Sequence, residues 1–141
     1  MTTQEYLDRS SAIRDDFRYD WKTRDAMLDA LTEQAHRELA VGDGVTIRLY
    51  SDHEAYTVIK RTPGTITIQR DKVTLDPDFK PQWIPGGFSA ICTNADDQRW
   101  IYERNTDGST LTLRFSKKHG RFMYLGKAIL IGRSEYYDYN F

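Results

Sequence analysis

The alternation of hydrophobic and polar positions is clearest between residues 42 and 73. Segments 45–50 and 65–70 carry an aliphatic residue at nearly every second position, and segment 55–60 is rich in Tyr, Val and Ile. A period of two with one apolar side is typical of β-strands. Between the last two segments, Thr62-Pro63-Gly64-Thr65 places Pro second and Gly third, which predicts a type II turn with a positive φ at Gly64. Short antiparallel strands in quick succession predict a small barrel or a strongly curled sheet.

A different period precedes these strands. Over residues 3–19 and again over 23–39, apolar residues recur every three or four positions, which predicts two helices, the first with Thr2 as its N-cap. Core packing is the expected role of both apolar stripes. A partner helix or self-association is the alternative, and it is stronger for the first helix.

Further strands are predicted across the second half of the chain, at 73–75, 88–92, 98–103, 110–115, 121–125 and 128–139. The intervening residues 76–87 contain three prolines and read as irregular, pinned over the barrel by their aromatic residues. The predicted fold class is therefore α+β: an N-terminal helical pair, followed by an antiparallel SH3-like small β-barrel with additional C-terminal strands. Residues 1–40 would form the helical N-terminal segment and residues 41–141 the barrel-like domain.

Composition narrows the possible chemistry. The single cysteine, Cys92, excludes an internal disulfide and a Cys-rich zinc site, and a buried thiol is expected. His36, His53 and His119 lack the spacing of metal ligands. Asp52-His53 could act as an oriented base, but no nucleophile lies near it in the sequence. We therefore expect no cofactor, no metal and no catalytic residue.

Localisation follows from what the chain lacks. It has no apolar run of membrane-spanning length, and its N-terminus is polar and acidic rather than a signal peptide. A cytoplasmic protein with no membrane contact is expected. The net charge of −1 gives no overall attraction to nucleic acid.

Charge is distributed unevenly, however. Residues 114–133 hold six basic residues and no acidic one, namely Arg114, Lys117, Lys118, Arg121, Lys127 and Arg133. Phe115, Phe122 and Tyr124 are interleaved with them. Basic groups beside aromatic faces can hold phosphates and stack bases, so these six residues and Tyr124 are the candidate binding site for nucleic acid or a nucleotide. The alternative is a solvated face whose charges block edge pairing.

The chain ends in aromatic residues. By alternation, Tyr137, Tyr139 and Phe141 share one side of a strand, and Tyr136 lies on the other. A strand with aromatics on both sides either crosses a core or meets a partner. Core packing is favoured, and Tyr136, Tyr137 and Tyr139 are the candidate partner contacts.

Three strings carry a resemblance to a known family: GDGVTIRLYSDHEAYTVIKRTPGTITIQRDK at 42–72, PGGF at 85–88 and GRSEYYDYNF at 132–141. From about Lys22 to the end, the chain resembles a family of small proteins encoded by phages, prophages and plasmids of gut bacteria. The resemblance implies a mobile-element context in a bacterial host cell. It carries no mechanism with it.

Three classes of function remain open. The first is a non-enzymatic binding protein that contacts nucleic acid or a nucleotide through the basic and aromatic hairpin. The second, implied by the resemblance, is a counter-defence protein that inhibits a host defence protein or captures a signalling nucleotide. A hydrolytic enzyme using Asp52 or His53 is the third. A homo-oligomer formed through the N-terminal helix is also possible.

Overall fold

The computed structural model describes residues 1–86 and 89–140, and it begins with two antiparallel helices, α1 (Thr3–Arg14) and α2 (Trp21–Arg37). The predicted N-cap is confirmed, since the Glu5 amide donates to the Thr2 hydroxyl at 3.1 Å. The first helix ends earlier than predicted, and Asp20 then caps α2 by accepting from the Thr23 amide at 2.8 Å. Neither described helix is both long and apolar enough to cross a bilayer.

The remaining elements are short antiparallel strands and one 3-10 turn. Their bounds are β1 (Gly44–Arg48), β2 (His53–Arg61), β3 (Thr65–Arg70), β4 (Lys72–Leu75), β5 (Trp83–Gly86), β6 (Ser89–Cys92), η1 (Ala95–Asp97), β7 (Trp100–Glu103), β8 (Thr110–Ser116), β9 (Arg121–Tyr124), β10 (Lys127–Ala128) and β11 (Leu130–Ile131). Seven of them form one sheet in the order β10-β9-β8-β3-β2-β1-β11. The predicted α+β class is confirmed.

This sheet curls into a nearly closed barrel. Residues 127–131 close it, because Lys127 and Ala128 pair with β9 while Leu130 and Ile131 pair with β1. Ile129 lies between these two pairings and is buried. The closing segment thus has one barrel edge on each side, which leaves few backbone groups unpaired.

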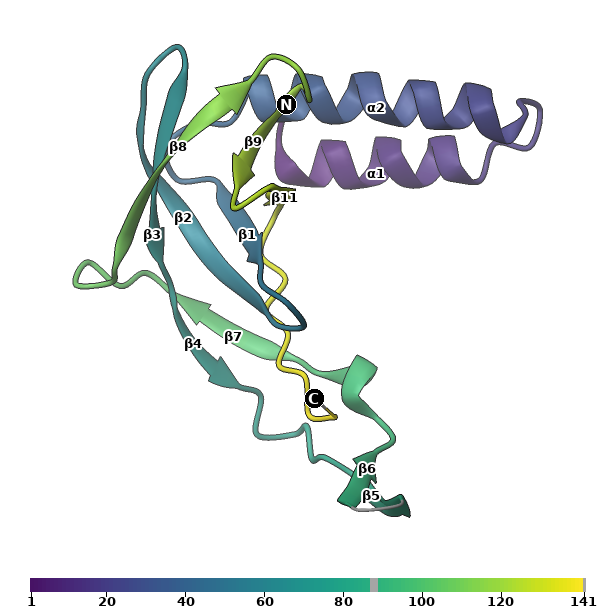
Figure 1. Cartoon of the computed structure of the whole chain (residues 1–141), viewed down its shortest axis with the longest axis vertical. Helices are drawn as coiled ribbons and strands as arrows, with labels where there is room; N and C mark the ends of the chain where they lie inside the picture. The colour runs from purple at the N-terminus through teal and green to yellow at the C-terminus, as the bar shows by residue number, and fades with distance from the viewer. Residues whose placement is uncertain (87–88, 141) are drawn as a thin grey trace.

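The barrel core receives residues from the helical segment as well as from the strands. Val45, Ile47, Ile66 and Phe122 are among its fully buried side chains. His36 of α2 stacks on Phe122, with ring centroids 6.2 Å apart, and Leu39, just beyond α2, belongs to the same cluster. The C-terminal end of α2 therefore covers one opening of the barrel, while the rest of the helical pair projects from it (Figure 1).

The turn between β2 and β3 differs from the predicted type. The hairpin itself is confirmed, and the Thr62 amide donates to the Thr65 carbonyl at 2.9 Å. Gly64, however, is not among the glycines with positive φ, so the type II turn was wrong. A Cβ at Gly64 would meet no heavy atom within 4 Å.

This geometry gives the first testable prediction. We expect Gly64→Ala to change the free energy of unfolding by less than about 0.5 kcal/mol, because the site has neither a positive φ nor a steric conflict. Gly120→Ala is the contrasting variant. Gly120 has φ +64°, and an added Cβ would collide with the Glu33 side chain, so a loss of about 1 kcal/mol or more is expected. Urea denaturation of both variants measures this, and equal losses would contradict it.

A second β region extends away from the barrel. β4 pairs with β7, and β5 pairs with β6 in a hairpin at the far end of the molecule from the helices (Figure 1). Residues 76–87 were predicted to be irregular and to lie over the barrel. This was wrong for residues 83–86, which form β5 and pair with β6 away from the barrel. Phe79 does anchor the segment, since it is buried and its ring centroid lies 6.2 Å from that of Tyr139. Phe88, the predicted start of the next strand, lies outside the described residues.

The last predicted strand, 128–139, forms only in part. The chain pairs as β11 and then reaches Gly132, whose φ of +88° turns it out of the sheet. Residues beyond Gly132 cross the outside of β1 and β2, where the Thr46 hydroxyl donates to the Gly132 carbonyl at 2.7 Å. His53 and Tyr136 form an isolated bridge there. Phe141 lies outside the described residues.

Candidate functional site

The basic residues predicted to share the β8–β9 hairpin fall into separate places. Arg114 is exposed on β8, and Lys117 and Lys118 are exposed in the turn after it. Within residues 1–86 and 89–140, none of these three side chains makes an ion pair or a hydrogen bond. They are therefore cations that remain available to an external anion.

Two of the predicted arginines are instead engaged within the fold. Arg121 donates to the Asp29 carboxylate of α2 at 2.6 Å, and its side chain is only 15% exposed. Arg133 donates to Asp71 at 2.8 Å. In both cases the acidic partner comes from a distant part of the sequence. These two guanidinium groups join structural elements, and a phosphate would have to compete with their present partners.

The last two predicted binding residues lie at the opposite end of β9 from Lys117 and Lys118. Tyr124 is half-buried and packs against the barrel core. Lys127 is exposed and donates to the Leu49 carbonyl at 3.3 Å. The six basic residues and Tyr124 thus do not form one continuous surface, and Tyr124 is not placed beside the turn lysines.

The structure adds a residue that the sequence did not single out. Lys60 of β2 pairs with Thr67 of β3, which pairs with Thr112 of β8. The Thr67 and Thr112 hydroxyls are 3.2 Å apart, so their side chains share one side of the sheet. Arg114 lies two residues along β8 from Thr112, on the same side. We call Lys60, Thr65, Thr67, Thr112 and Arg114 the outer face.

No acidic residue occupies these five positions, and the exposed Lys60, like Arg114, makes no ion pair within the described residues. The outer face therefore presents cations and hydroxyl groups together, and it continues along β8 toward Lys117 and Lys118.

A buried charge network lies next to the outer face, around Asp71. The Asp71 side chain is 1% exposed. It accepts from Thr57 at 2.6 Å and from Arg133 at 2.8 Å, and Arg104 lies 3.9 Å away. Arg104 also donates to Gln69 at 3.1 Å. The network fastens the C-terminal segment to the barrel and holds two partly exposed arginines at its surface.

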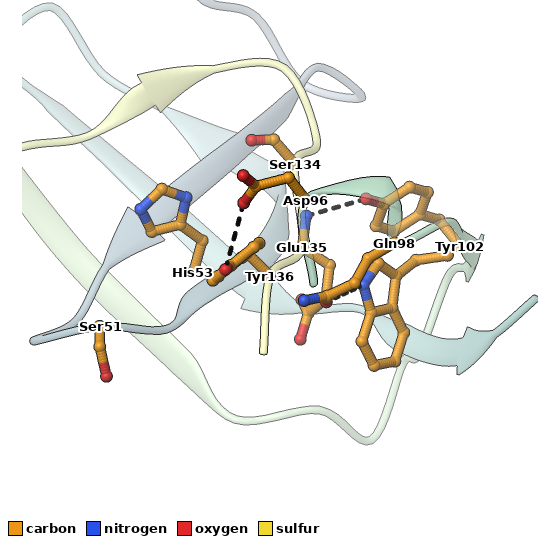
Figure 2. Close-up of a pocket in the computed structure, with 9 residues that line it drawn as sticks. Ser51, His53, Asp96, Gln98, Tyr102, Ser134, Glu135 and Tyr136 are labelled. Carbon is orange, nitrogen blue, oxygen red and sulfur yellow. Dashed lines mark hydrogen bonds between the residues drawn. The ribbon is translucent and has the colours of Figure 1, made fainter. Parts of the chain in front are cut away.

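Beyond this network is a pocket of about 420 Å³. It is lined by residues of three segments, 51–53, 96–102 and 134–136, which meet where the C-terminal segment passes β2 and β7 (Figure 2). Trp100, Tyr102, Tyr136 and the His53 imidazole supply its rings. Among the described residues, no lysine or arginine lines it. We call it the His53 pocket.

Hydrogen bonds fix the walls of the His53 pocket. The Glu135 amide donates to the Tyr102 hydroxyl at 2.8 Å (Figure 2). The Glu135 carboxylate is held by Arg70 through two contacts of 2.8 Å. Gln98 donates to the Tyr137 carbonyl at 2.6 Å and accepts from the Trp100 indole at 3.1 Å. Glu135 and Gln98 are therefore occupied within the fold.

His53 and Asp96 make fewer contacts within the fold than Glu135 and Gln98 do. The ring centroids of His53 and Tyr136 are 6.1 Å apart, and neither imidazole nitrogen hydrogen-bonds to another described residue. Partial burial, together with the positive charge of Arg48, lowers the pKa of His53 below its usual value. The imidazole is thus neutral at pH 7 and offers one donor and one acceptor. Asp96 accepts one long contact, 3.4 Å, from the Tyr136 hydroxyl.

The C-terminal tyrosines are placed mainly by contacts within the chain. Tyr139 packs against Phe79, Trp83 and Tyr137, with ring centroids 4.9 to 6.2 Å apart. Tyr136 bridges His53 and lines the pocket. Tyr137 is 52% exposed, and it alone of the three presents a large free surface.

The described residues contain no group of three or more His, Cys, Asp or Glu side chains placed to hold a metal ion. His36 is buried, and His119 lies exposed in the β8–β9 turn, away from His53. The Asp52 carboxylate accepts from the Asp138 amide at 2.7 Å and so fixes the C-terminal segment rather than orienting the His53 ring. Cys92 is a free, buried thiol, as predicted.

Comparison with known proteins gives one partial similarity. No family model matches the chain, and no solved structure matches it. Over 88 residues it is 30% identical to an oligoribonuclease of Escherichia coli O157:H7, and the match covers 56% of this chain. The chain spans about half the length of that protein, 47%. This similarity covers too little of the relative to place the chain in a family.

Proposed function

We propose that this protein is a small binding module for nucleic acid or nucleotides, built on an SH3-like barrel. The observation that carries the proposal is the outer face, together with the adjoining turn. Lys60, Arg114, Lys117 and Lys118 are exposed and have no acidic partner among the described residues, and the first two lie beside threonine hydroxyls. Lysine, arginine and hydroxyl side chains are the usual donors to phosphate oxygens.

The dimensions of the sheet suit a chain of phosphates. Lys60 and Arg114 are on strands separated by one intervening strand, so they lie about 10 Å apart across the sheet. This separation is larger than the spacing of successive phosphates in a single strand, so the two cations would contact phosphates that are not adjacent. Lys117 and Lys118 extend the row at the end of β8, and we expect about four phosphate contacts in total.

The similarity to an oligoribonuclease supports short RNA as the first ligand to test. That protein's name denotes action on oligoribonucleotides. We infer no nuclease activity for this chain, because binding alone follows from the cations and hydroxyl groups of the outer face.

A second function is favoured by a different surface. Phe17 and Trp21, at the free end of the helical pair, are 79% and 63% exposed. Large exposed aromatic residues are enriched at protein interfaces. A counter-defence protein encoded by a mobile element would use this end of the helices to bind a host defence protein, or to form an oligomer. Pull-down of a purified host factor by the unmodified chain but not by Phe17→Ser/Trp21→Ser would support it.

The binding proposal predicts a specific salt dependence. In the variant Lys60→Gln/Arg114→Gln/Lys117→Gln/Lys118→Gln, binding of labelled single-stranded RNA should weaken. The slope of log affinity against log salt should flatten by about 3, because each phosphate that is no longer neutralised changes it by roughly 0.7. Stability should hardly change, because the four groups are exposed and form no ion pair with a described residue. Fluorescence anisotropy with RNA, single-stranded DNA and duplexes over a salt series measures the slope.

A matched control removes the same charge elsewhere. Arg9, Lys22, Lys72 and Lys80 are also exposed and make no ion pair within the described residues, so the quadruple Gln variant at these positions has the same net charge. It should retain most of the affinity and the salt slope. An equal loss in both variants, or no binding by the unmodified protein tighter than about 0.1 mM at low salt, would refute the proposal.

A further inference from the structure

The His53 pocket is chemically different from the outer face. Its rings come from Trp100, Tyr102, Tyr136 and His53, and no lysine or arginine of the described chain lines it. Arg70, which lies behind its Glu135 wall, is already bound to that carboxylate. A phosphate placed in this pocket would meet the Asp96 carboxylate with no lysine or arginine among the described lining residues, and the neighbouring Arg48 already donates to the Ala128 carbonyl. The pocket therefore suits an uncharged planar group better than it suits an anion.

Its free hydrogen-bonding groups point to a particular kind of planar group. Asp96 is exposed, and its carboxylate accepts only the long contact from Tyr136 among the described residues, so it can accept from an N–H donor. No described residue hydrogen-bonds to the donor or the acceptor of the His53 imidazole. Aromatic side chains stack on every base, and carboxylates accept from exocyclic amino groups. Guanine, adenine and cytosine carry such an amino group, whereas uracil does not.

The pocket and the outer face lie on the same side of β2, separated by the buried Ala55 and Thr57. His53, Ala55 and Thr57 point to the same side because they alternate along the strand. Ile59 is an extra residue in the pairing with β3, so Lys60 rather than Ile59 pairs with Thr67. The bulge therefore brings Lys60 to that side as well. Between pocket and outer face lie the arginines of the Asp71 network, Arg133 and Arg104, whose side chains are 31% and 44% exposed.

We propose that the His53 pocket receives one unpaired base of the bound strand, with preference for a base that bears an exocyclic amino group. This inference rests on the proposed function. The strand would run along the outer face, pass the partly exposed Arg104 and Arg133, and place its base against Trp100 and Tyr136. Asp96 accepts from the amino group, and His53 contacts a ring nitrogen or oxygen of the base.

The test compares variants at the two ends of this path. The ligands are labelled eight-nucleotide RNAs of uridine only, or with one adenosine, cytidine or guanosine at each position in turn. We expect the unmodified protein to prefer the substituted strands. His53→Ala and Asp96→Ala should reduce that preference about tenfold and leave the salt slope unchanged, since every phosphate remains contacted. Both variants should fold, because the His53 ring has no hydrogen bond among the described residues and Asp96 is exposed.

The outcomes separate the two proposals. If the outer-face variant flattens the salt slope while His53→Ala and Asp96→Ala bind every strand like the unmodified protein, the pocket inference is overturned and the proposed function stands. If the unmodified protein binds no strand, both are overturned. A direct readout is the His53 ring signal in NMR spectra, identified by its absence from His53→Ala. It should shift on addition of the adenosine-containing strand and not on addition of uridine-only RNA.

Discussion

Lowering the pH from 6.5 to 4.5 should destabilise the fold through the buried His36. Its side chain is 1% exposed, and its Nδ1 accepts a hydrogen bond from the Phe122 amide at 3.0 Å. Burial, reinforced by the positive charge of Arg121, lowers the pKa of His36 to about 3. In the unfolded chain the pKa of histidine is about 6.5. Between these two values the unfolded state binds a proton that the folded state does not bind, so stability falls as the pH falls.

The size of this effect can be measured against a matched variant. One proton contributes about 1.4 kcal/mol per pH unit, so roughly 2 to 3 kcal/mol should be lost between pH 6.5 and 4.5. His36→Asn is the comparison, because an Asn oxygen can still accept from the Phe122 amide but does not titrate. Urea denaturation at several pH values should give a shallower dependence for His36→Asn than for the unmodified protein. The same pH series with His53→Ala measures the smaller contribution of His53, whose pKa is also lowered, to the pH dependence of stability. Parallel curves for His36→Asn and the unmodified protein would contradict the assignment.

The elements that were predicted well are those whose signal is local. Residue periodicity predicted strands β2, β3 and β8 and the two helices, and the cap at Thr2 marked the start of the first helix. Both signals lie within a short stretch of sequence and do not depend on distant contacts. The β2–β3 turn was wrong in type because Pro followed by Gly is compatible with more than one turn, and Gly64 does not use the positive φ that glycine allows. The final strand ended earlier than predicted because Gly132 adopts a positive φ.

The candidate site was harder to predict, because basic residues that are close in the sequence were assumed to be close in space. Arg121 and Arg133 belong to the basic stretch, yet each is paired with an acid 92 or 62 residues away. Lys60 was missed for a different reason. Strict alternation places it on the same side as Tyr56 and Val58, and only the bulge at Ile59 turns it outward. Nothing in the sequence marks that bulge.

The His53 pocket illustrates a further limit. Its residues come from segments 51–53, 96–102 and 134–136, and their meeting depends on where the C-terminal segment crosses the barrel. The Asp52-His53 loop and Tyr136 were both noted in the sequence, but as separate features. Had the bridge between His53 and Tyr136 been known, the two would have indicated one site.

Asp71→Ala should destabilise the protein by about 3 kcal/mol. The variant removes an acid that is 1% exposed, and it leaves the Arg133 Nε and the Thr57 hydroxyl without their carboxylate acceptor, although Arg133 still donates to the Thr57 oxygen through its other nitrogen. Removing one partner of a buried ion pair commonly costs about 3 to 5 kcal/mol, because the remaining charge is uncompensated. The lower end applies here, since the Arg133 side chain is 31% exposed and water can solvate it in part. Urea denaturation measures the loss.

Asp29→Ala is the control that separates burial from ion pairing as such. Asp29 contacts Arg121 at 2.6 Å, but its side chain is 76% exposed, and Arg121 still donates to the Gly120 and His119 carbonyls without it, so its removal should cost no more than about 1 kcal/mol. The double variant Asp71→Ala/Arg133→Met should regain part of the stability lost in Asp71→Ala, because the uncompensated cation is gone. A loss of no more than about 1 kcal/mol for Asp71→Ala would show that the Asp71 network does not fasten the C-terminal segment. The wall that this segment gives to the His53 pocket would then need another source of rigidity, of which the Arg70–Glu135 pair is the nearest candidate.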